Sequence, residues 1–239
     1  MRFEGDDVPG PLQYFIWFSC TLLEVGVLVC AYHRHALRQY FLLNLYIACE
    51  VVASVVRFEI LHHYGLSSLN YAYFYYYSDA LLTILLFLAL SSLYSQVFSE
   101  LSAGRYVQFG ALFLLSATAL FSFAVVQQSS AKLLSHFVFE LSQNLYFVGL
   151  VLTYILWAAI LKLRETRARL IQVVLSLGIY FSLYAANYAL RNLYPSMESV
   201  FQSLNPLIGC FLPFAWAYAF WRIPEEARLE PSRLAVIQR

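Results

Sequence analysis

The sequence predicts an all-α membrane protein: one domain over residues 1–239, built as a bundle of seven transmembrane helices. The first observation is composition, because 61% of the residues are hydrophobic and only 12% are charged, against about 25% charged in soluble domains. The second is the length of the apolar segments, since roughly 20 residues cross a hydrocarbon core of about 30 Å as a helix. Barrel strands are about 10 residues long and alternate in polarity, so these segments favour helices.

The seven predicted segments are 11–32, 40–62, 71–97, 106–126, 136–161, 170–190 and 201–221. The first follows an acidic start without the basic region of a signal peptide, so we expect it to stay as a helix. The third opens with the aromatic run Tyr71–Tyr77, which is typical of a membrane interface. The fourth is uncharged and rich in small residues, which favours close packing or a homodimer. The seventh contains Pro206 and Pro213, and we expect these to kink it.

Lysine and arginine predict the orientation of the bundle. They concentrate in 33–39, 162–169 and the tail 222–239, whereas the opposite side carries only Arg2, Lys132 and Arg191. The positive-inside rule then places the N-terminus outside and the C-terminus in the cytoplasm of a multi-pass protein of the cell membrane. Lipid is the expected surrounding partner, and a net charge of +1 gives no sign of a nucleic-acid partner. The tail is short, so a signalling role requires a separate protein partner.

Charged side chains inside predicted helices are the first candidates for function, because they are costly in lipid. Arg57 and Asp79 lie at similar depths in the outer halves of the second and third segments, which a short turn joins as antiparallel neighbours. We therefore expect an ion pair between them. The pair either fastens the two helices together or forms a site for an anionic ligand that uses the two-pronged guanidinium.

Further polar residues fall in the outer halves of later segments: Glu140, Asn144, Asn187 and Asn205. With Arg57 and Asp79 they predict a ligand-binding chamber that faces outward. The alternative is that these six residues pair two by two across separate helix interfaces.

Glu24 and Glu50 are predicted at middle depth in the first two segments. Two neighbouring buried acids could carry protons across the membrane. The alternative is that they are protonated and hydrogen-bonded to a neighbour such as Asn44.

Neither cysteine nor histidine predicts a metal or a cofactor. The four cysteines, Cys20, Cys30, Cys49 and Cys210, all fall inside predicted helices, and we expect small apolar packing without a disulfide. His62, His63 and His136 lie at outer helix ends, where interfacial polar residues are common. A zinc site would need three or four converging ligands.

Several seven-helix families fail on their own requirements. A retinal protein needs a lysine deep in the last helix, but Lys132 and Lys162 stand at helix ends. G-protein-coupled receptors carry an acid-arginine switch where the third segment here ends Tyr94-Ser-Gln-Val-Phe98. Sugar-efflux carriers join parallel three-helix repeats by a linker helix, and loops 33–39 and 162–169 do recur at similar positions. Those carriers rely on prolines inside the first, second, fifth and sixth helices, which this chain lacks.

An arginine in the second segment, followed by a tyrosine-rich entry to the third segment that ends Ser78-Asp79-Ala80, resembles a group of uncharacterised bacterial seven-helix membrane proteins. The resemblance covers the second and third segments, and some members carry Glu and Trp where this chain has Asp79 and Tyr76. Because the group has no established activity, the resemblance implies the fold and adds no function.

Three functions therefore stand open from the sequence. We favour a receptor-like or sensory bundle that binds a small ligand in an outward polar cavity and acts through a cytoplasmic or membrane partner. The first alternative is a small-solute transporter with proton-linked Glu24 and Glu50. The second is a membrane enzyme or a subunit of a membrane assembly, although no catalytic set of residues is evident.

Overall fold

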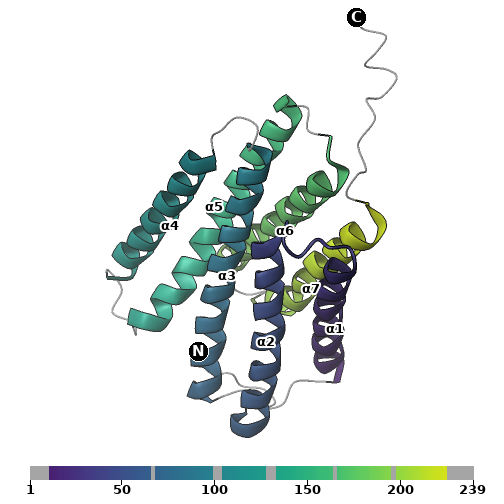
Figure 1. Ribbon diagram of the computed structural model, residues 1–239. Coiled ribbons are helices and arrows are strands. Elements are labelled where there is room, and N and C mark those ends of the chain that lie inside the picture. Colours follow the sequence, from purple (N-terminus) through teal and green to yellow (C-terminus); the bar gives the residue numbers. More distant parts are fainter. Residues whose placement is uncertain are drawn as a thin grey trace, which may run out of the picture.

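The computed structural model describes residues 11–65, 68–98, 104–127, 133–163, 166–194 and 198–224. Within these ranges the chain forms seven helices, so the predicted all-α fold is confirmed (Figure 1). The helices are α1 Pro11–His33, α2 Phe41–Tyr64, α3 Leu69–Val97, α4 Gly104–Gln127, α5 Leu133–Leu163, α6 Ala168–Leu193 and α7 Glu198–Arg222. The seventh helix is continuous through Pro206 and Pro213.

Six of these helices, all but α4, are long and apolar enough to cross a membrane. In α4, the apolar stretch among the described residues is Phe113–Ala124, which is shorter than the spans of the other six helices. The structure therefore supports a multi-pass membrane protein, while a seventh span at α4 and the orientation of the bundle stay predictions.

Six helices form a closed ring. Neighbours pack in the order α1, α2, α3, α5, α6 and α7, and α7 returns to pack against α1. Helix α4 lies outside this ring at the edge of the bundle, against α5 and α3 (Figure 1). It presents Phe109, Phe113 and Phe121 outward as exposed side chains, as expected of a face in lipid. The chain thus consists of two three-helix units, α1–α3 and α5–α7, joined by a peripheral helix.

The two three-helix units bury matching positions. Each pair of corresponding helices has buried residues at identical spacings: Glu24, Val27 and Ala31 in α1 with Thr153, Leu156 and Ile160 in α5; Leu43, Asn44, Tyr46 and Ile47 in α2 with Val173, Val174, Ser176 and Leu177 in α6; Leu86, Ala89, Leu90 and Leu93 in α3 with Leu212, Ala215, Trp216 and Ala219 in α7. Corresponding helices also have corresponding neighbours in the ring. The two units therefore correspond in the order of their helices around the ring, and we call this correspondence the pseudo-repeat, although the sequences of the units differ.

Closure of the ring overturns one expectation about cysteine. Cys20 of α1 and Cys210 of α7 form a disulfide with their Cα atoms 5.1 Å apart, whereas Cys30 and Cys49 are free. The sequence showed only that each cysteine lay within a helix. It could not show that the first and last helices are adjacent, which brings together two residues separated by 190 positions.

Arginines from the two loops at one end of the bundle bind the ends of helices in the opposite unit. Arg34, between α1 and α2, donates to the carbonyl oxygen of Trp221 at the end of α7 at 3.0 Å. Arg167, between α5 and α6, donates to the carbonyl oxygen of Gln96 at the end of α3, also at 3.0 Å. Each loop thus caps the third helix of the other unit, where free carbonyls favour a cation. We call these two contacts the arginine latches and this end the arginine-rich end.

Candidate functional site

The interior of the ring contains most of the polar residues singled out in the sequence. Arg57 of α2 donates to the hydroxyl of Ser78 on α3, from Nε at 2.9 Å and from Nη2 at 2.6 Å. Its guanidinium also lies 4.6 Å from the centre of the Tyr75 ring. Arg57 and Asp79 are both among the described residues and form no ion pair within 4.0 Å, so the expected Arg57–Asp79 pair is wrong.

Asp79 is turned one step around α3 from Ser78, toward α5. Its carboxylate lies beside Ser142 of α5 and within electrostatic range of Arg57. A shift of one residue rotates a side chain by about 100° on a helix, so neighbouring Ser78 and Asp79 cannot both face the same arginine. The sequence placed both residues at the right depth but could not resolve this rotation.

Asn187 and Asn205 occupy the corresponding place in the second unit. Asn187 Nδ2 donates to Asn205 Oδ1 at 2.6 Å, joining α6 to α7. The interval from Ile47 to Arg57 in α2 equals the interval from Leu177 to Asn187 in α6. Likewise, the interval from Asp79 to Leu86 in α3 equals the interval from Asn205 to Leu212 in α7. A polar layer in the half of the bundle away from the arginine-rich end therefore occurs in both units, with charged residues in the first and neutral amides in the second.

The remaining two predicted chamber residues lie on α5. Asn144 Nδ2 donates to Ser122 Oγ of α4 at 3.0 Å, so it faces the peripheral helix rather than the ring interior. Glu140 precedes it by one helical turn and is half-buried. Asn144 and the Asn187–Asn205 pair thus lie at different helix interfaces, as the alternative of separate pairing expects for them. Whether any of them binds a ligand stays a prediction.

Glu24 and Glu50 face each other between α1 and α2. One turn farther from the arginine-rich end, the hydroxyls of Thr21 and Ser54 lie 2.7 Å apart. Residues three or four positions apart share one face of a helix. Glu24 lies three residues after Thr21 on α1, and Glu50 lies four residues before Ser54 on the antiparallel helix α2. Glu24 therefore lies opposite Glu50. Glu24 is 5% exposed, and its Oε2 has no hydrogen-bond partner.

A cluster of tyrosines, which sequence reasoning missed, lies inside the ring around the level of Glu50. Tyr146 of α5 stacks on Tyr184 of α6 with ring centres 4.7 Å apart, and Tyr184 lies 4.8 Å from Tyr180. Tyr46 of α2 contacts the ring of Trp216 on α7. These four tyrosines, Tyr46, Tyr146, Tyr180 and Tyr184, form the tyrosine cluster. The spacing of Tyr180 and Tyr184 on one helical face was the available signal.

The acids and the tyrosine cluster belong to one site. Tyr46 lies beside Glu50, and Tyr184 lies within electrostatic range of both Glu50 and Asp79. Glu50, Asp79 and Tyr184 are all half-buried. We call Glu24, Glu50, Arg57, Asp79 and the tyrosine cluster the polar column.

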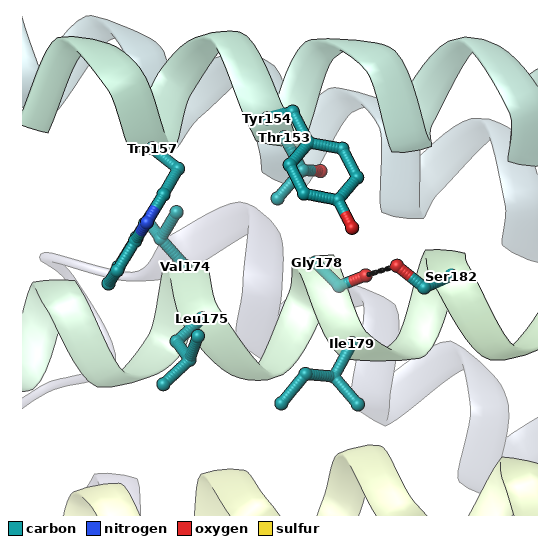
Figure 2. A pocket seen from close by; sticks show the side chains of 8 residues that line it. All are labelled: Thr153, Tyr154, Trp157, Val174, Leu175, Gly178, Ile179 and Ser182. Carbon is teal, nitrogen blue, oxygen red and sulfur yellow. Dashed lines mark hydrogen bonds between the residues drawn. The ribbon is translucent and has the colours of Figure 1, made fainter.

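A separate groove lies between α5 and α6 (Figure 2). It has a volume of about 120 Å³, and Thr153, Trp157, Val174 and Gly178 are among the residues that line it. Tyr154 and Ile179 at its rim are exposed, so the groove opens on the outer surface of the ring. Its lining is mainly apolar and suits a hydrocarbon chain of a lipid. None of the predicted ligand-binding residues lines it.

No group of three or more histidine, cysteine, aspartate or glutamate side chains within the described ranges is placed to hold a metal ion. His63 Nε2 instead lies 2.8 Å from Glu59 Oε1, one turn earlier on α2. Both side chains are largely exposed at the end of the helix.

Comparison with known proteins found no matching family model, curated protein or solved structure.

Proposed function

We propose that this protein is a small-solute carrier that exchanges its substrate with protons across the membrane. The observation that carries the proposal is the polar column at middle depth inside a ring of two parallel pseudo-repeats. Carriers are commonly built from such repeats, with substrate and ion sites where the repeats meet near the bilayer midplane. The six-helix ring and its peripheral helix supply this architecture.

The acids supply the coupling. Glu24 and Glu50 lie in the first unit, and Tyr180 and Tyr184 of α6 in the second unit lie within electrostatic range of Glu50. A charge in the membrane interior is costly and marks ion or substrate pathways. A proton bound to these carboxylates removes the cost of the buried charge, and a bound substrate does the same. If a proton and a substrate replace each other at this site, the movement of protons is coupled to the movement of substrate.

The arginine latches supply a gate in the proposal. Both latches bridge the two units at the arginine-rich end, which the positive-inside rule places in the cytoplasm. Closing this end while the other opens is the movement that alternating access requires of two repeats. The described state corresponds to one in which the cytoplasmic end is closed.

The proposal is tested by proton movement in liposomes that contain the purified protein and an internal pH dye. Pools of small solutes are added outside, and active pools are divided until one compound remains. We expect a solute-driven proton flux that falls at least tenfold in the Glu24→Gln, Glu50→Gln double variant. This change removes both proton-binding groups and keeps nearly the same side-chain volume.

The matched control is Glu59→Gln, which makes the same change on α2 at an exposed site beside His63. It should leave the flux unaltered. Solute flux that persists unchanged in the double variant would contradict proton coupling through these acids.

A ligand-sensing bundle is the second candidate, favoured by the position of Arg57. Its guanidinium lies over Tyr75 in the outer half of the bundle, where a small anion arriving from outside could compete with Ser78 for it. In that case Arg57→Ala abolishes ligand-induced thermal stabilisation, and the liposomes show no flux of any solute.

A further inference from the structure

The charges and aromatic rings of the polar column define the kind of substrate that the column would hold. The column contains three carboxylates, from Glu24, Glu50 and Asp79, and one cation, Arg57. Arg57 already donates to Ser78 and stacks on Tyr75, and it lies nearer the outer end of α2 than Glu50 does. When Glu24 and Glu50 are ionised, Arg57 therefore does not neutralise them, and the middle of the ring carries net negative charge.

The acid pair also has unused binding capacity. Glu24 is almost completely buried, and its Oε2 has no hydrogen-bond partner. Trp216, which contacts Tyr46 beside Glu50, is fully buried with its Nε1 likewise unpartnered. Buried polar atoms are nearly always satisfied in folded proteins. Unsatisfied buried atoms on Glu24, which faces Glu50, and on Trp216, which contacts Tyr46, indicate a site that is completed by a ligand.

The tyrosine cluster supplies the other half of that site. Tyr146 and Tyr184 stack face to face, and Tyr180 is tilted against Tyr184. Aromatic faces attract cations, most strongly where water is excluded, and aromatic cages bind quaternary ammonium groups. A compact inorganic ion would use the carboxylates but gain little from four rings, whereas an anion would be repelled by the carboxylates.

Building on the proposed carrier function, we propose that the substrate is a small organic cation, an amine or quaternary ammonium compound. Its charge lies between Glu24 and Glu50, and its carbon groups lie against the tyrosine cluster. The same acids bind either protons or this cation, so entry of the cation releases protons from the pair.

The test is equilibrium dialysis of radiolabelled choline against the purified full-length protein in detergent, repeated with its uncharged carbon isostere 3,3-dimethylbutanol. We expect saturable binding of choline and none of the isostere. Binding should be at least tenfold weaker in Glu50→Gln and unaltered in Glu59→Gln, with folding of each variant checked by gel filtration. Tyr184→Phe should retain binding, because it keeps the aromatic face, whereas Tyr184→Leu should lose it.

Proton competition gives an independent readout. Groups facing Glu50 are Glu24 from α1, Tyr46 and Arg57 from α2, Asp79 from α3, and Tyr180 and Tyr184 from α6. Because only the deprotonated acids attract the cation, choline affinity should rise with pH in the wild type, and less so in Glu50→Gln.

Equal binding of choline and 3,3-dimethylbutanol, or choline binding that Glu50→Gln leaves unchanged, overturns the inference. Absence of saturable binding for both choline and tetraethylammonium overturns it as well. If another solute still drives proton flux that depends on Glu24 and Glu50, the carrier function survives and only the substrate class is wrong.

Discussion

Replacing Gly149 by leucine should destabilise the bundle by about 2 kcal/mol, the cost typical of overpacking a filled core. A Cβ at Gly149 of α5 would meet Cε1 of Phe181 on α6 at 2.5 Å and two more atoms of that ring within 2.9 Å. Phe181 is itself fully buried against Tyr146 and Tyr180. It therefore cannot move without disturbing the tyrosine cluster.

The measurement is thermal aggregation of the purified protein in detergent. Gly110→Leu is the matched control, because a Cβ at Gly110 meets nothing within 4 Å, and its melting temperature should equal that of the wild type. Adding Phe181→Ala to Gly149→Leu should recover part of the loss. Equal melting temperatures for the two leucine variants would contradict the close packing of α5 against α6.

Removing both arginine latches, as Arg34→Ala with Arg167→Ala, should open the arginine-rich end. Each latch is a charge-assisted hydrogen bond to a helix-terminal carbonyl, and a cation at an exposed helix end is worth about 1 kcal/mol. If the arginine-rich end is in equilibrium between a closed and an open state, loss of both contacts changes the ratio of open to closed protein at least tenfold. The buried Arg169, which donates to the carbonyl of Ile223 at 2.7 Å, would still join α6 to α7.

The opening is measured by labelling Ser176→Cys with a membrane-impermeant maleimide from the arginine-rich side, in a background with Cys30 and Cys49 replaced by serine. Ser176 is buried on α6. Labelling should be at least fivefold faster without the latches. The matched control is Arg38→Ala, an exposed residue of the same first loop as Arg34. Identical rates in all variants would mean that the latches do not hold this end closed.

The helices could be predicted from the sequence because hydrophobic length alone determines a membrane span. The sequence also indicated which polar residues lie within helices, as Glu24, Glu50, Arg57 and Asp79 do. Rotation was not predictable, because a single residue step decided that Ser78 rather than Asp79 binds Arg57. For the same reason Asn144 binds Ser122 of α4 rather than facing the ring interior.

Ring order was beyond the sequence as well, because it depends on which helices pack together over long separations. The Cys20–Cys210 disulfide follows from the contact of α1 with α7. The pseudo-repeat was equally hidden, since corresponding positions carry different side chains, as at Glu24 and Thr153. The correspondence between α2 and α6 is visible only when the buried positions of the two helices are compared.

Alternating access is the central claim, and access to Ser142 tests it most directly. Ser142 of α5 is 1% exposed beside Asp79. Ser142→Cys, with Cys30 and Cys49 replaced by serine, is exposed to an impermeant maleimide in right-side-out and in inverted vesicles. A carrier predicts labelling from both sides, with solute accelerating one and slowing the other. Labelling from one side only, whatever the solute, would contradict the account.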